Sequence, residues 1–232
     1  MTQVQILSGG AAQGLVKALE PQLAARGLSV GGTFGAVGAM RDKLLAGEPC
    51  DLVVLTEALI RELQQQGHAR PGSERPLGRV RTGIAVKTGD ALPRVDDEAS
   101  LKATLEGAKA IYFPDPEKAT AGIHFMKVLR TLGLDGQLKD RLRAFPNGAT
   151  AMRAMAESGE PGSVGCTQVT EILYTAGVQL VGNLPKAFEL ATVYTAAVAT
   201  TSAASEAAAE VATLLASAEA AELRQAGGFD PL

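Results

Sequence analysis

The sequence is poor in the residues that metal sites, disulfide frameworks and membrane spans require. Its 232 residues include two cysteines, two histidines and no tryptophan. Cys50 and Cys166 belong to no CxxC pair, and His68 and His124 stand far apart in the sequence, so no metal-ligand spacing is present. We predict two buried free thiols, no metal and no cofactor. No run approaches the roughly 18 apolar residues of a transmembrane helix, which argues against membrane insertion.

The charges are nearly balanced. The chain carries 22 Lys and Arg against 25 Asp and Glu, and the cationic residues are scattered rather than clustered, which argues against nucleic acid as a partner. The first ten residues, MTQVQILSGG, contain no cationic segment, no long apolar segment and no cleavage site of a signal peptide. As written, the sequence predicts a cytoplasmic protein, and a periplasmic one if a signal peptide has been removed.

Strand-like and helical patterns alternate along most of the chain, which predicts an α/β fold. The run Val4–Leu7 reads as a strand, and a helix is expected from about Ala11 to Arg26, with Leu15, Leu19 and Leu23 on its apolar face. The segments LSVGGTF and CDLVVLT read as further strands, each followed by a helical segment. This βαβαβα order predicts a parallel sheet.

Two long strand-like runs, at Arg79–Lys87 and Phe188–Thr200, separate this first set of elements from a second one. They predict two lobes joined by two crossovers, with residues 1–80 and 193–232 in lobe 1 and residues 81–192 in lobe 2. An Ala-rich helix from about Ser202 to Ala226, with Val211, Leu214 and Leu215 on its apolar face, would return to lobe 1.

Several loops connect a strand to a helix in a way that favours anion binding, because backbone N–H groups and the helix dipole converge there. Two lie in lobe 1 and two in lobe 2. The predicted ligand-binding residues of these loops are Ser8, Gly9, Gly10, Ala11, Gly35, Ala36, Val37, Thr120, Ala121, Asn147, Gly148 and Thr150. The alternative for the glycine turns is a purely structural strand-to-helix connection. The alternative for Asn147 is a helix N-cap.

Polar side chains also end a strand in the segment SVGCTQ. Thr167 offers a hydroxyl and Gln168 an amide with donors and an acceptor, a set that suits an organic acid better than a bare tetrahedral anion. Arg81 precedes the apolar run TGIAV and is a candidate carboxylate clamp. A solvated strand residue and a structural ion pair are its alternatives. His124 is a candidate catalytic residue, with a structural histidine as its alternative.

The order and spacing of four segments resemble the periplasmic-binding-protein type II superfamily, in particular the molybdate-binding proteins of ABC importers. The segments are VQILSGGAAQGLVKAL, TFGAVGAMRDKLLAGEPCDLVVLT, FPDPEKATAGIHFMKVLRTLG and SVGCTQVTEI. The resemblance implies two lobes, two crossover strands and a central ligand cleft. Where the family places serine hydroxyls and a tyrosine, this chain has Ala11, the run Gly35–Gly38 and Gln168. These differences predict a carboxylate rather than molybdate.

Two functions therefore remain open. The first is a small-anion binding protein, for a carboxylate or an oxyanion, that closes by hinge motion and serves the membrane subunit of an ABC importer if it is exported. The second is a cytoplasmic isomerase of a small polycarboxylate, similar to aconitate isomerase, which shares this fold. Its base would be His124, Glu171 or Tyr194, and Arg81 would supply the positive charge.

Overall fold

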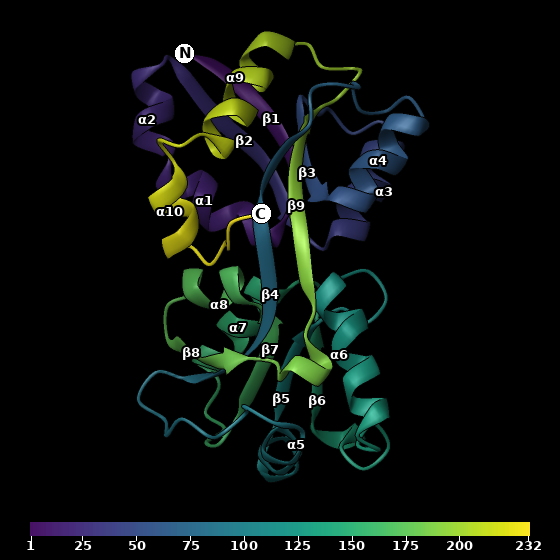
Figure 1. Ribbon diagram of the computed structural model, residues 1–232, viewed down its shortest axis with the longest axis vertical. Helices are drawn as coiled ribbons and strands as arrows, with labels where there is room; N and C mark the ends of the chain where they lie inside the picture. Colours follow the sequence, from purple (N-terminus) through teal and green to yellow (C-terminus); the bar gives the residue numbers. More distant parts are fainter. The chain divides into compact units, whose positions relative to one another are not determined.

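The computed structural model describes all residues from Met1 to Leu232, and the chain forms two compact units. Unit 1 consists of Met1–Val80 and Thr192–Leu232, and unit 2 of Arg81–Ala191. The lobe boundaries expected from the sequence lie within one residue of these. The chain passes between the units twice, within strand β4 (Arg75–Lys87) and at the start of strand β9 (Ala191–Val198), both drawn in Figure 1.

Unit 1 is built on a sheet in which β1 lies between β2 and β3, and β3 continues to β9. The strands β1 (Thr2–Gly9), β2 (Leu28–Gly35) and β3 (Leu52–Thr56) are parallel, as predicted, and β9 runs antiparallel to β3. The helical segments of unit 1 are η1 (Gly10–Ala12), α1 (Gln13–Ala18), α2 (Glu20–Ala25), α3 (Val37–Leu45), α4 (Glu57–Gln65), α9 (Ser205–Ala216) and α10 (Ala221–Ala226).

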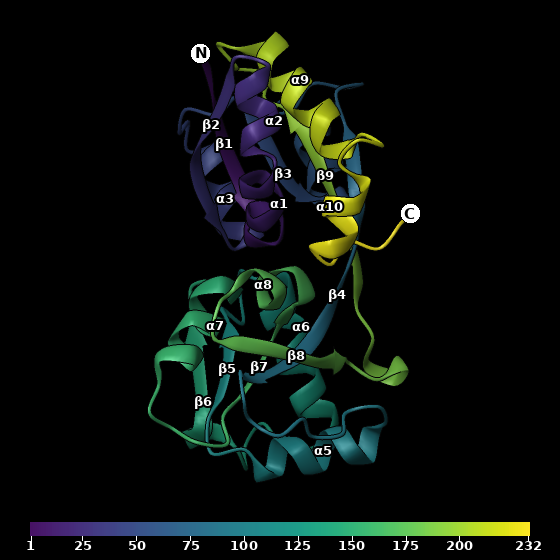
Figure 2. The ribbon, with the colours of Figure 1, turned by 90° about the vertical axis from the view of Figure 1, so that its left-hand side faces the viewer.

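Helices cover both faces of the unit 1 sheet. Figures 1 and 2 show α1, α2, α9 and α10 on one face and α3 and α4 on the other. The apolar strand residues between these layers are almost fully buried, and Val211, Leu214 and Leu215 of α9 belong to the same core. The Ala-rich tail is therefore part of unit 1, and burial of both sheet faces explains why β3 reads as a continuous apolar run.

Two expectations are wrong: the helices predicted from about Ala11 to Arg26 and from about Ser202 to Ala226 are each divided into two. The first breaks at Leu19, between α1 and α2, because Pro21 has no N–H to donate to the carbonyl of Lys17. The C-terminal helix breaks after Ala216. There the hydroxyl of Ser217 donates to the carbonyl of Leu214 (2.8 Å) and accepts the N–H of Ala220 (3.2 Å), the N-cap residue of α10.

Unit 2 is built on a second sheet, in the order β4, β7, β5, β6, and β8 pairs with β4. Strand β7 (Val164–Gln168) is antiparallel to β4 and parallel to β5 (Ile111–Pro114). Strand β6 (Leu142–Phe145) is parallel to β5, and β8 (Val178–Asn183) is antiparallel to β4. The helical segments are α5 (Glu98–Gly107), α6 (Thr120–Thr131), η2 (Lys139–Arg141), α7 (Gly148–Glu157), α8 (Val169–Tyr174) and η3 (Lys186–Phe188).

Side chains along these strands alternate between two separate apolar cores. Ile84 and Cys166 belong to the core that contains Phe125 of α6 and Leu101 of α5. The other face carries Ala85 and Tyr112, which pack with residues of α7 and α8. Because strand side chains alternate with period two, the side of the sheet on which a polar residue lies follows from its position in the strand.

Some elements of unit 2 differ from the sequence-based expectation. The strand expected over Phe188–Thr200 is β9, which spans only Ala191–Val198, and Phe188 belongs to the short helix η3. The short strands β6 and β8 were not expected. Each has intermediate or exposed residues throughout, so neither carries the apolar run that marks a buried strand.

Both cysteines are free and buried, which confirms the prediction. Burial raises the pKa of the Cys50 thiol to about 12 and raises the pKa of Cys166 further, so neither thiol is ionised near neutral pH. None of the helices combines the length and the apolar character needed to cross a bilayer.

Asp51 joins three segments of unit 1. Its carboxylate accepts the N–H of Gln5 (2.8 Å), the hydroxyl of Ser202 (2.7 Å) and the N–H of Ala204 (3.1 Å). Burial opposes ionisation, but these hydrogen bonds outweigh it and hold the pKa of Asp51 below its usual value. The carboxylate therefore ties β1 to the chain that leads into α9.

We expect Asp51→Ala to lower the free energy of unfolding by about 2–4 kcal/mol at pH 7, because three donors lose a charged acceptor. Since the folded-state pKa is depressed, this contribution is present above the unfolded pKa, about 4, and is lost as the pH falls through the folded value. Urea unfolding at pH 7 and pH 3 measures both values, with the exposed Asp140→Ala as the control. Equal destabilisation at the two pH values would contradict the assignment.

Candidate functional site

The strand ends of unit 1 form one edge from which two helical segments start. Gly9 of β1 pairs with Gly35 of β2, so these strands end at the same level. η1 follows directly after Gly9, and α3 begins at Val37 with Ala36 as its N-cap. Ala36 provides no side-chain hydrogen bond to the helix, so the first-turn N–H groups of α3 have no side-chain cap.

The other residues of this edge serve mainly to pack it. The hydroxyl of Ser8 is fully buried and donates to the carbonyl of Gly9 (2.9 Å). A side chain at Gly9 would meet Val37 (2.8 Å) and Tyr194 (2.9 Å), so this glycine allows close packing. Gly10 and Ala11 are buried in η1. Ligand contacts by the predicted residues of this edge remain a prediction.

On one face of the unit 2 sheet, polar side chains form hydrogen bonds with one another and with the start of α7. Asn147 is the N-cap of α7, where its side-chain oxygen accepts the N–H of Thr150 (2.9 Å). Asn147 therefore acts as a helix N-cap, the alternative that the sequence left open for it. On the same face the hydroxyl of Thr167 donates to the carboxylate of Glu171 (2.5 Å), and both side chains are buried. A side chain at Gly148 would collide with both, which explains the glycine at the start of α7.

Glu171 is the buried acid of this face. Burial raises the pKa of its carboxyl group, against the opposing effect of hydrogen bonds from the Thr167 hydroxyl and from the backbone of Ala149, Gln168 and Gly148. The carboxyl group of Glu171 thus occupies the N-terminal end of α7, where the sequence predicted a ligand anion. Glu171 entered the sequence analysis only as a possible base, because its position at α7 depends on tertiary structure.

The opposite face of the same sheet leaves its polar groups without partners. Gln168 ends β7 and lies opposite Thr82 of β4, so the two side chains are on the same face, that of α5 and α6. Gln168 is 3% exposed and Thr82 is 1% exposed. Neither the amide nitrogen nor the amide oxygen of Gln168 has a hydrogen-bond partner, and the Thr82 hydroxyl has none either. Buried polar groups of native proteins are rarely left in this state.

Helix α6 begins on this face without a side-chain cap. Its N-cap residue is Ala119, and Thr120 and Ala121 form its first turn. A side chain at Gly122 would collide with the backbone carbonyls of Pro114 and Asp115, so the glycine lets the helix start directly against the end of β5. The uncapped N–H groups of α6 therefore lie on the same face of the sheet as the unpaired amide of Gln168 and the unpaired hydroxyl of Thr82.

His124, the candidate catalytic residue, makes a structural contact. Its Nε2 atom lies 2.7 Å from the carbonyl oxygen of Phe188, which can only accept, so this nitrogen is the donor. The bond connects α6 to η3. A catalytic role for His124 stays a prediction, and with this bond in place only Nδ1 is available to act as a base.

Arg81 forms an ion pair with Glu189, with 3.1 Å between the charged atoms and a little over a third of each side chain exposed. The two residues belong to the two chain segments that pass between the units, and the N–H of Thr82 donates to the carbonyl of Leu190 beside them (3.2 Å). The alternation along β4 also directs Arg81 to the face opposite Thr82 and Gln168. The structural ion pair was one alternative for Arg81, and a ligand contact stays a prediction.

No cluster of His, Cys, Asp and Glu side chains is arranged to hold a metal ion. Thr82 was missed as a site residue, because its pairing with Gln168 depends on the register between strands 86 residues apart. The sequence carried no signal of that register.

We expect Arg81→Ala to lower the free energy of unfolding by about 0–1 kcal/mol, because partly exposed ion pairs contribute little. We expect the affinity for a bound anion to change by less than about 3-fold, since Arg81 leaves the strand on the other face from Gln168. Calorimetric titration of Arg81→Ala and of Glu189→Gln, which breaks the same pair but keeps the arginine, tests this. A loss of affinity of about 10-fold or more in Arg81→Ala alone would assign the arginine to the ligand.

Comparison with known proteins places this geometry in a family. The chain is 26% identical to an aconitate isomerase of Pseudomonas sp. over 241 aligned positions, which cover 100% of this chain and 89% of the relative. Among solved structures, the periplasmic molybdate-binding protein of Azotobacter vinelandii matches with a TM-score of 0.82 and 21% identity, over 97% of this chain and 98% of that one.

The sulfate-binding protein of Mycobacterium tuberculosis matches with a TM-score of 0.77 and 18% identity, over 100% of this chain and 88% of that one. These structures establish the fold, which is that of the periplasmic binding proteins and confirms the predicted fold class. The model of a protein family described as "bacterial extracellular solute-binding protein" matches residues 4–230, and the chain belongs to that family.

Proposed function

We propose that this protein binds a small organic carboxylate and that Gln168 is a central ligand contact. The observation that supports this most directly is the amide of Gln168, which is buried with neither polar atom paired. Burying an amide without a partner costs about 1–3 kcal/mol, and a ligand that supplies the missing partners repays this cost. The Thr82 hydroxyl and the uncapped first turn of α6 lie on the same face and add neutral donors.

The chemistry of these groups favours a carboxylate over a tetrahedral oxyanion. An amide both donates and accepts, so Gln168 can serve a ligand that carries a hydroxyl or a protonated acid beside an ionised carboxylate. The molybdate- and sulfate-binding proteins are named for bare oxyanions, which only accept hydrogen bonds and make no use of the amide oxygen. The uncapped helix ends supply partial positive charge for the carboxylate.

We further propose that the protein is exported and delivers its ligand to the membrane subunit of an ABC importer. The family description, extracellular solute-binding, supports this role. The two units would close on the ligand by a hinge in the two connecting segments, near Val80–Arg81 and Ala191–Thr192.

We expect di- and tricarboxylates to stabilise the protein in a thermal-shift screen that also contains molybdate, tungstate and sulfate. Ligand at about 100 times its Kd adds roughly 2.7 kcal/mol to the free energy of unfolding. The same ligand should reduce the radius of gyration measured by small-angle scattering, as hinge closure requires. Stabilisation by molybdate or sulfate alone would contradict the carboxylate assignment.

The variant Gln168→Leu tests the site itself, because it predicts effects of opposite sign. Replacing an unpaired buried amide by an apolar side chain of similar size should raise the free energy of unfolding of the free protein by about 1 kcal/mol or more. Affinity should fall about 10-fold or more, as expected for loss of a hydrogen bond to a charged ligand. The exposed Gln137→Leu is the matched control. A structural role for Gln168 would instead lower stability and leave affinity unchanged.

A second candidate function is isomerisation of a small polycarboxylate. Two observations favour it: the similarity to aconitate isomerase spans the whole chain, and Glu171, which is buried at the start of α7, has a raised pKa. Moving a double bond along such a molecule requires a base that takes a proton from one carbon and an acid that returns a proton to another. A carboxylate whose pKa is raised towards neutral suits that task.

If this second function holds, the protein converts cis-aconitate to trans-aconitate, which proton NMR follows directly. We expect Glu171→Gln to lose at least about 100-fold in rate, the usual scale for a general base, and to keep most of its affinity. The wild-type rate should rise with pH as the carboxyl group ionises through its raised pKa. Glu157→Gln, a change of an exposed acid in α7, is the control. Binding without any turnover by the wild-type protein would leave only the binding function.

A further inference from the structure

A cavity lies in unit 2, at the opposite end of β7 from Gln168. Its volume is about 450 Å³, within the usual range for small-molecule sites, and it is formed by the start of β7, the end of α5 and the connection that follows β4. Val164 and Gln168 are the first and last residues of β7, so the cavity is separate from the groups assigned above to the carboxylate.

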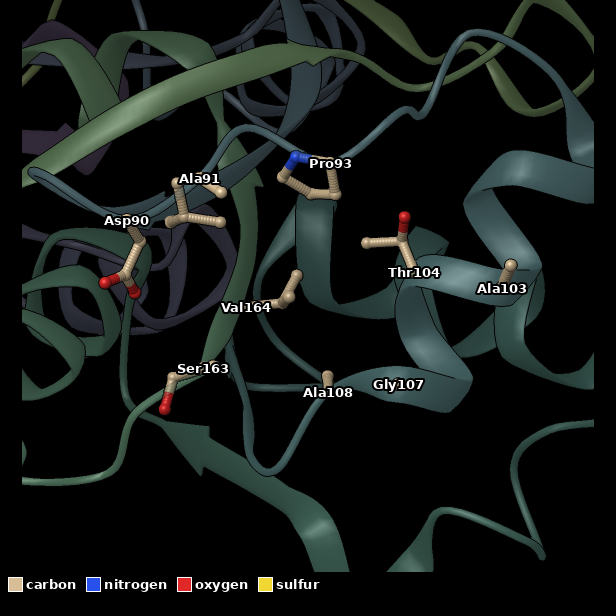
Figure 3. Close-up of a pocket in the computed structure, with 11 residues that line it drawn as sticks. Asp90, Ala91, Pro93, Ala103, Thr104, Gly107, Ala108, Ser163 and Val164 are labelled. Atoms are coloured by element: carbon tan, nitrogen blue, oxygen red, sulfur yellow. The ribbon is translucent and has the colours of Figure 1, made fainter.

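The wall of this cavity is mostly apolar. Figure 3 shows Pro93, Val164 and Ala108 around it, and the methyl group of Thr104 directed inwards while its hydroxyl points away. That hydroxyl donates to the carbonyl of Arg94 (2.8 Å), and the hydroxyl of Ser163 donates to the carbonyl of Glu160 (2.9 Å). Both hydroxyl protons are therefore already used, and neither hydroxyl is available as a donor to a ligand.

Asp90 is the single ionisable side chain that lines the cavity, and Figure 3 shows it at the end opposite Thr104. Its Oδ2 atom is shielded from solvent and has no hydrogen-bond partner. Lys87, three residues earlier, does not pair with Asp90, because its ammonium group donates a hydrogen bond to the carbonyl of Ser158 (3.0 Å). Because a carboxylate attracts cations and repels anions, Asp90 favours a cationic ligand group in this cavity.

The part of the chain that carries Asp90 is held in place. The N–H of Asp90 donates to the carbonyl of Lys87 (3.0 Å), and its own carbonyl accepts from the amide of Gln179 in β8 (3.0 Å). On the other side of the cavity, the N–H of Lys109 donates to the carbonyl of Gly162 (3.0 Å). The cavity is thus formed before any ligand arrives, which reduces the entropic cost of binding.

We propose that this cavity binds a small organic ammonium ion, with the ammonium group on Asp90 and a compact apolar body against Val86, Pro93, Ala108 and Val164. The apolar wall favours an alkyl or aryl group over a hydrated inorganic cation. The site would work independently of the carboxylate site, because the two have opposite charge preferences and different residues.

The test uses benzylammonium as the probe and benzyl alcohol as its neutral analogue, titrated into the full-length protein and followed by ¹⁵N NMR. We expect benzylammonium to bind with millimolar affinity and to shift the amide signals of residues around Asp90, Thr104 and Val164. Benzyl alcohol should bind at least about 10-fold more weakly, as loss of a charge-assisted contact implies. Equal binding of the two compounds, no binding, or signals that shift elsewhere would each overturn the proposal.

Two variants assign the contacts. Asp90→Asn should weaken benzylammonium binding at least about 10-fold and leave benzyl alcohol binding unchanged. Ala91 is an exposed residue of the cavity wall, so Ala91→Phe can be accommodated and should weaken the binding of both compounds. Glu117→Gln, an exposed acid elsewhere in unit 2, controls for net charge. Gln168→Leu should have no effect, which separates this site from the carboxylate site, and an unchanged affinity in Asp90→Asn would overturn the role of Asp90.

Discussion

The alternation of side chains at the end of β7 is the constraint on which the proposed site depends. Thr167 and Gln168 are neighbours in the chain but leave opposite faces of the sheet. Thr167 meets Glu171 and the start of α7, where its hydroxyl donates to the Glu171 carboxylate. Gln168 meets Thr82 and the α6 side, where the amide finds none. A shift of one residue in register would exchange these roles.

The two helix N-termini of unit 2 that the sequence predicted as anion sites differ in the folded chain. A helix N-terminus attracts negative charge, and unit 2 contains two such ends, at α6 and α7. The protein fills the end of α7 with its own carboxyl group, from Glu171, and with the side chain of Asn147. The end of α6 carries no comparable group. Two loops that look alike in the sequence thus differ in the folded chain in whether their N–H groups are open to an anion.

The unpaired groups near Gln168 are neutral hydrogen-bonding groups and not charged side chains. Arg81 is engaged by Glu189, and this ion pair joins β4 to the segment that leads into β9. A ligand held by an amide, a hydroxyl and backbone N–H groups needs no desolvated arginine, and its release costs correspondingly less.

Much of the architecture was readable from residue patterns. The apolar run of β3 indicated a strand inside the parallel unit 1 sheet, since a strand buried on both faces must be apolar throughout. The two long strand-like runs at Arg79–Lys87 and Phe188–Thr200 indicated where the chain divides. The polar residues Thr167 and Gln168 at the end of an apolar strand indicated a candidate site, because an apolar core gives no reason for an amide there.

Tertiary structure decided what those residues can do. The break at Pro21 and the loss of strand character at Phe188 are local, and the sequence contained their causes. The pairing of Thr82 with Gln168, the position of Glu171 at α7 and the cavity beside Asp90 each join residues far apart in the chain. Hydrogen bonding and burial depend on such neighbours. The sequence by itself therefore determined which groups could bind a ligand, and only the folded structure determined which of them the protein leaves unpaired.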